Sequence, residues 1–250
     1  MSALSPSRAG RLAALRAEVR AIETAGRAAA RPCLRLGVAE VDARLAGGGL
    51  AAGALHEIAP DRPDLGDDAA ATLFAAVLAA RAGEGTVLWA LSRRDLFAPG
   101  LAAAGLPPDR VLYAECRGDE EVLAVMEEGL RHGGLAAVVG EAGRAAMAAT
   151  RRLQLAAEES GTAALMLKRW RRNGADPLAL PSAAVTRWRL ASAPSAPLDV
   201  PGIGRARWRL VLARQRGGEP CEWLMEAPDE TARLALAADP RHRPDRAQAA

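Results

Sequence analysis

The residues whose types and spacing could do chemistry lie in one loop, residues 59–68, which reads Ala-Pro-Asp-Arg-Pro-Asp-Leu-Gly-Asp-Asp. The loop follows a predicted strand over 54–58 and precedes a predicted helix over 67–82. At this place, α/β nucleotide-binding proteins carry a glycine-rich loop whose backbone N–H groups hold phosphates, while a lysine supplies positive charge. The place and the length of the loop therefore suit phosphate binding, and its residue types decide whether the site can work.

The residue types of this loop oppose phosphate binding. Gly66 is its single glycine, it has no lysine, and Asp67 and Asp68 stand where a lysine and a serine or threonine are usual. Carboxylates repel phosphate, and the two prolines remove N–H donors from the cradle. We therefore predict a degenerate nucleotide loop, no bound cofactor and no catalytic residue, with the loop marked by Ala59, Pro60, Gly66, Asp67 and Asp68.

A further acid of interest is Glu141, which follows a predicted buried strand over 135–139. P-loop ATPases use an acid after a buried strand to hold the metal ion, and Glu141 could be the remnant of such a ligand. The alternative is that Glu141 begins the next helix, predicted over 142–159, near the positive end of its dipole. We favour the helix start, because the acid is displaced by one position and is Glu rather than Asp.

Cysteine, histidine and the apolar runs exclude other kinds of site. The three cysteines and three histidines are scattered without metal-ligand spacing, so we expect no metal site and a reduced, cytoplasmic environment. The longest apolar run, 69–80, is too short to cross a bilayer, and residues 1–31 show no signal-peptide pattern. We therefore expect a cytoplasmic protein with no membrane association.

The basic residues point to a partner. Of the 33 basic residues, 32 are arginines and one is Lys168, and 13 basic residues stand against 4 acidic ones between 151 and 216. Within that stretch tryptophans alternate with arginines, which suits a cationic strand face that contacts DNA phosphates or an acidic protein partner. The candidate contact residues are Arg169, Arg171, Arg172, Arg187, Arg189, Arg207 and Arg209, with Trp188 and Trp208 as candidate base-stacking residues.

Two alternatives remain for these residues. For the tryptophans we favour a structural role, in which each indole fills a small core under a hairpin while the neighbouring arginines face solvent. For the arginines, solvation alone and binding of an anionic partner are weighed equally.

The elements that position these residues follow a regular pattern. Short apolar runs alternate with helices from 54 to 167, which is typical of a doubly wound, mostly parallel α/β sheet. Three further strands are expected over 185–191, 207–213 and 222–226, the last two as a hairpin. The predicted division is an arginine-rich N-terminal helix over 1–31, an α/β core over 32–170, a basic β-rich extension over 171–228 and a disordered tail over 229–250.

The segment before the loop resembles a known fold family. Residues 36–42, Leu-Gly-Val-Ala-Glu-Val-Asp, and residues 47–58, Gly-Gly-Gly-Leu-Ala-Ala-Gly-Ala-Leu-His-Glu-Ile, are similar to the opening of a RecA core, with Ala51 in place of the usual turn proline. Residues 92–95, Ser-Arg-Arg-Asp, lack the glutamate that RecA proteins use to activate water. The resemblance implies a RecA-like fold, while the departures imply that its nucleotide site is inactive.

A RecA-like chain with a degenerate loop and a basic C-terminal region resembles the ImuA family. The closing segments, residues 207–210 and 213–218, look like that family's C-terminal signature, and the resemblance covers residues 10–228. It implies a non-catalytic adaptor in SOS-induced, error-prone translesion DNA synthesis after DNA damage. The implied partners are an ImuB-like inactive polymerase homologue, RecA, an error-prone DnaE-type polymerase complex and, as an open alternative, DNA.

Two other functions remain open at this point. One is a residual RecA-type ATPase that works through unusual contacts, which a saturable thermal shift with ATP and magnesium would support. The other is a SulA-like cell-division inhibitor, which filamentous growth on overexpression would support. Proteins of that second class are shorter and are expected to lack the N-terminal helix and the basic hairpin.

Overall fold

The computed structural model describes residues 32–170, 174–196, 198 and 201–237. The helix predicted over 1–31, the two candidate contact residues Arg171 and Arg172, and residues 238–250 of the predicted tail lie outside the described residues.

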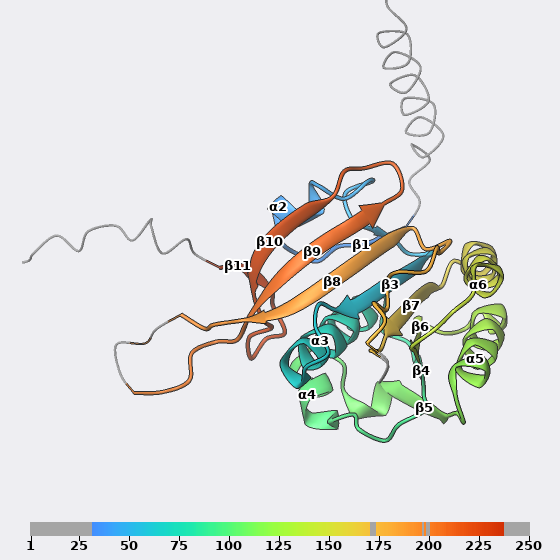
Figure 1. Ribbon diagram of the computed structural model, residues 1–250, viewed down its shortest axis with the longest axis horizontal. Helices are drawn as coiled ribbons and strands as arrows, with labels where there is room; N and C mark the ends of the chain where they lie inside the picture. The colour runs from blue at the N-terminus through green and yellow to red at the C-terminus, as the bar shows by residue number, and fades with distance from the viewer. Residues whose placement is uncertain (1–31, 171–173, 197, 199–200, 238–250) are drawn as a thin grey trace, which may run out of the picture.

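A nine-stranded sheet forms the centre of the molecule (Figure 1). Its strands lie in the order β11-β10-β9-β8-β3-β7-β6-β4-β5, and all neighbours from β8 to β5 are parallel. The parallel strands are β3 (Leu55–Pro60), β4 (Val87–Leu91), β5 (Val111–Glu115), β6 (Ala137–Ala142), β7 (Ala163–Lys168) and β8 (Thr186–Ala193). The antiparallel part comprises β9 (Arg207–Gln215), β10 (Cys221–Glu226) and β11 (Ala235–Leu236). A separate two-stranded sheet pairs β1 (Cys33–Leu34) with β2 (Leu50–Ala51).

Helices cover both faces of the parallel sheet (Figure 1). On one face α3 (Leu65–Arg81) and α4 (Ala98–Ala103) pack with the larger core cluster, and on the other α5 (Asp119–His132) and α6 (Met147–Ser160) pack with the smaller one. The short helix α2 (Ala39–Asp42) and a 3-10 turn over Pro108–Arg110 complete the set. This confirms the predicted doubly wound α/β fold, in which buried parallel strands are apolar on both faces.

The C-terminal strands share the core of the parallel sheet. β8 pairs in parallel with β3 on one side and antiparallel with β9 on the other. The Trp188 ring lies 5.5 Å from that of Phe74 on α3, centroid to centroid, and Trp208 belongs to the same buried cluster. The strands predicted after residue 170 are therefore present, but they extend the main sheet and do not enclose a small core of their own.

Several boundaries differ from the predictions. Ala59 and Pro60 belong to β3 and are buried, so the loop itself begins at Asp61. Glu141 lies inside β6, and α6 begins only at Met147, so the expected helix start at Glu141 was wrong. Ala235 and Leu236 pair with β10, so the ordered sheet continues past the predicted boundary at 228.

Two further observations concern the end of helix α5 and the possibility of a membrane-crossing helix. Helix α5 ends at His132, and its C-cap Gly133 has a left-handed φ of 70°. None of the helices within the described residues has the length and apolar character needed to cross a membrane.

Candidate functional site

The degenerate loop lies at the carboxyl end of β3, where open α/β sheets bind their ligands. The loop is short because α3 begins at Leu65, with the Asp64 side chain capping it by accepting a hydrogen bond from the Asp67 N–H at 2.9 Å. Asp64 is therefore the N-cap, and Asp67, where the helix was predicted to begin, lies in the first turn. A polar side chain at this cap satisfies an N–H group that the helix itself leaves free.

The side chain of Asp67 is fully buried and surrounded by donors. Its carboxylate accepts hydrogen bonds from Ser192 at the end of β8, through the backbone N–H at 2.7 Å and Oγ at 3.1 Å. It also accepts from Arg62, through the backbone N–H at 3.1 Å and Nε at 3.2 Å. Burial opposes ionisation of Asp67, but the hydrogen bonds from Arg62 and Ser192 and the charge of Arg62 outweigh it and hold the pKa of the carboxyl below its usual range.

A second charged network lies beside the first and is centred on Arg169, directly after β7. Nη2 of Arg169 lies 2.8 Å from the Glu141 carboxylate, and Nε donates to the same oxygen at 2.9 Å. Nη1 lies 3.4 Å from Oδ1 of Asp68 and 3.0 Å from Oγ1 of Thr72 on α3. Trp89 donates to the other oxygen of Glu141 at 2.9 Å. Arg169 thus bridges the acid on β6 and the start of α3, and it is not a free surface cation.

These residues do not fit a nucleotide or its metal ion. A phosphate loop directs N–H groups and a lysine toward a ligand, whereas here a buried carboxylate already takes the donors of Arg62 and Ser192. The loop serine or threonine and the later acid normally share a Mg²⁺ ion, whereas here the corresponding Asp68 and Glu141 share Arg169. Within the described part of the chain, no three His, Cys, Asp or Glu side chains are grouped so that they could hold a metal ion.

Two of the predicted contact arginines are tied to acids near the sheet centre. Nε of Arg187 lies 2.7 Å from the buried carboxylate of Glu57, its neighbour on β3, and Nη2 donates to the Leu180 carbonyl at 3.0 Å. Nη2 of Arg189 lies 2.5 Å from the Asp176 carboxylate. Both arginines neutralise carboxylates of this chain.

The other two lie on β9 and are also ion-paired. Arg207 pairs with Glu226 at 3.3 Å. Arg209 pairs with Asp61 of the loop at 2.7 Å and with Glu222 at 3.6 Å. The side chain of Arg209 is 42% exposed, whereas that of Arg207 is largely buried. The structure therefore does not gather the five described arginines of the predicted set into one free cationic face.

The two candidate stacking residues are buried. Trp188 is completely inaccessible, and Trp208 is nearly so. Neither indole can reach a nucleic-acid base without unfolding the core, so base stacking by them was wrong. Both tryptophans have the favoured structural role, but in the main core and not in a separate small core under the hairpin.

The sequence analysis missed the acids that pair with these arginines. Glu57 and Asp61 are 130 and 148 residues from their partners in the chain, and their pairing depends on the order of strands in the sheet. Asp176 lies in the loop before β8, 13 residues from Arg189. The one available signal was Glu57 itself, because a carboxylate inside a buried apolar strand requires a cation or hydrogen-bond donors nearby.

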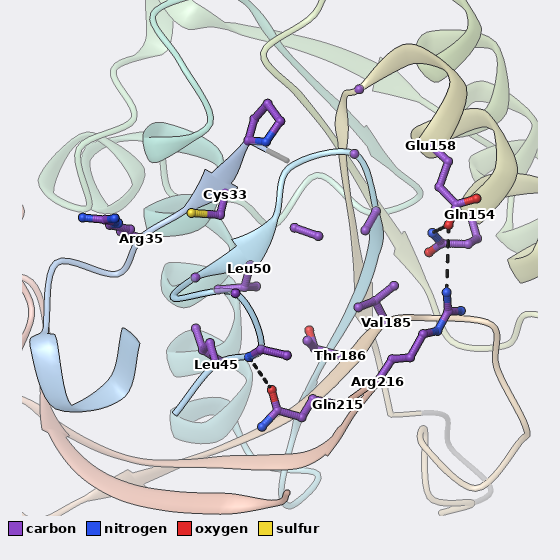
Figure 2. A pocket seen from close by; sticks show the side chains of 18 residues that line it. Cys33, Arg35, Leu45, Leu50, Gln154, Glu158, Val185, Thr186, Gln215 and Arg216 are labelled. Atoms are coloured by element: carbon purple, nitrogen blue, oxygen red, sulfur yellow. Dashed lines mark hydrogen bonds and ion pairs between the residues drawn. The ribbon is translucent and has the colours of Figure 1, made fainter. Parts of the chain in front are cut away.

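A pocket of about 480 Å³ lies at the opposite end of the sheet, near the amino ends of β3, β7 and β8 (Figure 2). Its lining includes Cys33, Leu50, Gln154, Glu158 and Gln215, and none of the predicted site residues. Figure 2 shows Gln154 and Glu158 facing one another on α6, with Nε2 of Gln154 donating to Glu158 at 2.8 Å. Gln215 Oε1, also at this pocket, accepts a hydrogen bond from the Ala46 N–H at 3.1 Å.

Beneath this pocket lies a buried histidine. Nδ1 of His56 lies 2.7 Å from Oγ1 of Thr186, which accepts a hydrogen bond from Trp188 Nε1 at 2.7 Å, and Nε2 lies 2.9 Å from the Ala51 carbonyl oxygen. Because Oγ1 accepts from Trp188, its own hydrogen can go to Nδ1, while Nε2–H donates to Ala51. Burial lowers the pKa of His56 to about 4, although the bond to Ala51 acts in the other direction. His56 is thus a neutral structural histidine.

Comparison with known proteins relates the chain to characterised relatives. No protein-family model matches the chain. It is 38% identical over 214 residues to "Protein ImuA" of two strains of Caulobacter vibrioides, NA1000 / CB15N and ATCC 19089, covering 82% of this chain and 87% of each relative. In structure it is similar to the RadB recombinase, with a TM-score of 0.57 and 17% identity, over 82% of this chain and all of that one. The structural match confirms the predicted RecA-like fold.

Proposed function

The chain belongs to the ImuA family, and on that premise we propose that it is a non-catalytic accessory protein of SOS mutagenesis, acting in error-prone translesion synthesis as an adaptor. In this proposal it connects an ImuB-like inactive polymerase homologue with RecA and an error-prone DnaE-type polymerase. Its place of action is the cytoplasm.

The proposal that the protein is non-catalytic rests on the contacts that the residues of the degenerate loop make. The loop donors are used by Asp67 and the acids that could hold a metal are used by Arg169. The single lysine of the chain, Lys168, is buried in β7, and burial lowers its pKa. A residual ATPase would need a cation free to grip phosphate, and this site offers none among its described residues.

For the partner contact we propose the outer face of the β9–β10 hairpin. Trp208, Leu210 and Met225 are buried on its inner face, and because neighbouring residues of a strand point to opposite faces, Arg209 and Leu224 lie on the outer one. These two residues are opposite each other in the strand register and are 42% and 41% exposed. An arginine beside an exposed apolar side chain is typical of a protein-binding surface.

The same geometry favours a protein over DNA as the direct partner. The four candidate arginines on β8 and β9 are each paired with a carboxylate, so DNA phosphates would have to displace those acids to bind them. A mixed surface of Arg209, Glu222 and Leu224 suits a protein partner that offers complementary charges and apolar contacts.

The test is a co-expression pull-down of the full chain with the ImuB-like protein of the same host. The double variant Arg209→Ser/Leu224→Ser should lower capture at least about tenfold, which corresponds to about 1.4 kcal/mol of binding free energy. The matched control is Arg152→Ser/Leu155→Ser on α6, whose two side chains are 57% and 56% exposed, and it should be captured like the unmodified chain.

Each outcome bears on a different part of the proposal. Equal capture of both double variants would contradict the β9–β10 surface while supporting the adaptor role. Failure to capture the folded, unmodified chain would contradict the adaptor role itself. Tight, steeply salt-dependent binding of single-stranded DNA that is lost in the Arg209 variant would favour DNA as the direct partner.

A further inference from the structure

This chain differs most from its fold family in the groups that occupy the phosphate and metal positions of the loop. We infer that the degenerate loop is closed by the chain's own charges: the Asp67 carboxylate takes the place of a bound oxyanion, and the Arg169 guanidinium takes the place of the metal cation. This inference concerns the isolated protein, and it holds whether or not the proposed partners are correct.

The donors around Asp67 are those that proteins use to hold an oxyanion. Two backbone N–H groups, from Arg62 and Ser192, point at the carboxylate, together with the Ser192 hydroxyl and the Arg62 guanidinium. Asp67 also lies in the first turn of α3, where the helix dipole favours negative charge. Main-chain N–H groups, a helix start and a cation together make the anion site of a phosphate loop.

The place of the cation is defined by the two acids on either side of Arg169. Asp68 stands at the sequence position of the loop serine or threonine, and Glu141 stands on the strand that carries the metal-binding acid in P-loop ATPases. Nη1 of Arg169 lies 3.4 Å from Asp68, and Nη2 lies 2.8 Å from Glu141. One positive charge from the end of β7 thus joins the two elements that a divalent cation would otherwise join.

The consequence is a core that needs no nucleotide to hold the end of the sheet together. Asp67 ties α3 to the end of β8 through Ser192, and Arg169 ties α3 to β6 through Asp68 and Glu141. An entering phosphate would meet a buried carboxylate, and an entering metal would meet a guanidinium. Removal of the Asp67 carboxylate should therefore leave a cradle that accepts a small oxyanion from solution.

The experiment measures the thermal midpoint of the full chain and of Asp67→Ala in sodium chloride, sodium formate and sodium phosphate at equal ionic strength. Asp67→Ala should melt below the unmodified chain in chloride and should regain about 3 °C, saturably, between zero and 100 mM formate or phosphate. Phosphate stabilises most folded proteins slightly by exclusion from their surface, so the unmodified chain and Asp68→Ala serve as references. Neither reference should show a saturable rise.

Identical anion dependence of Asp67→Ala and the unmodified chain would overturn the inference. If Asp67→Ala does not fold, Asp67→Asn keeps the size of the side chain and removes only its charge. That variant should melt several degrees below the unmodified chain, and an unchanged midpoint would show that the negative charge is not needed. Carboxyl carbon NMR of the unmodified chain gives a third measurement: Asp67 should titrate below the usual aspartate range, and ordinary titration would contradict the inference.

Discussion

At the scale of the residue, the molecule matches buried acids with arginines. Glu57 pairs with Arg187 and Glu141 pairs with Arg169, in both cases with almost no exposure of the carboxylate. A buried carboxylate without a partner would be strongly unfavourable, so these arginines are needed for folding.

Replacement of Arg187 should therefore destabilise the protein. Arg187→Ser removes the cation that is hydrogen-bonded to the buried Glu57 carboxylate and leaves the charge of nearby Lys168 to offset it. We expect a loss of about 3 kcal/mol in the free energy of unfolding. Arg209→Ser is the control, because its ion pairs are partly exposed and their loss should cost about 1 kcal/mol or less. Urea denaturation of both variants measures the difference. Equal stabilities of the two variants would contradict a structural role for Arg187.

The second residue-scale prediction concerns pH and His56. Its pKa is about 4 in the folded state and 6.5 in the unfolded chain, so the unfolded state binds more protons between these values. Stability from this group is therefore complete above about pH 6.5 and falls as the pH drops toward 4, by about 3 kcal/mol in total.

Urea denaturation at pH 7.5 and at pH 4.5 tests this for the unmodified chain and for His56→Gln. The variant has no titrating imidazole, so its loss of stability between the two pH values should be smaller. An equal loss in both proteins would show that other groups cause the acid sensitivity.

The sequence was enough to predict that the loop is not an ordinary phosphate site. It was not enough to predict the hydrogen-bond partners of the loop residues. The absence of lysine and the row of aspartates excluded an ordinary phosphate site directly. That Asp67 would accept hydrogen bonds from Ser192, 125 residues away, depends on β8 lying beside β3. The sequence pattern of a strand does not say which strand will be its neighbour.

At the scale of the element, periodicity located the helices and strands of the α/β core, with errors at their ends. The error at α3 arose because Asp64, Asp67 and Asp68 are all acceptable caps by residue type, and only the backbone geometry selects Asp64. The error at Glu141 arose because an acid after an apolar run is typical of the end of a strand. Glu141 lies inside β6 because Arg169 pairs with its buried carboxylate, and the sequence pattern does not indicate that pairing.

The elements after residue 180 are predicted to be indispensable for folding. A chain that ends at Leu180 lacks β8 to β11, so it loses Trp188 and Leu190 from the main core and leaves the edge of β3 unpaired. We expect it to be insoluble or to unfold without cooperativity. The control is a chain ending at Ala237, which retains every described strand and should melt like the full chain. Cooperative melting of the shorter chain would contradict a single shared core.

At the scale of the whole molecule, the chain has a RecA-like sheet. Its own charged side chains occupy the carboxyl end of that sheet, where open α/β sheets bind their ligands. The carboxyl end carries two internal charge networks, and the basic extension supplies the parallel strand β8 and the antiparallel strands β9 and β10 of the same sheet. The fold class could be predicted because alternating apolar runs and helices require it. The merging of the extension with the core could not, because it depends on long-range strand order.

Isothermal titration calorimetry of the full chain with ATP and Mg²⁺ tests most directly whether this ImuA-family chain works without nucleotide. Because Asp67 and Arg169 already fill the places of phosphate and metal, the titration should show no saturable heat up to about 1 mM ATP, a limit that corresponds to about 4 kcal/mol of binding free energy. Saturable, stoichiometric binding with a micromolar dissociation constant would contradict the claim and would restore the ATPase hypothesis.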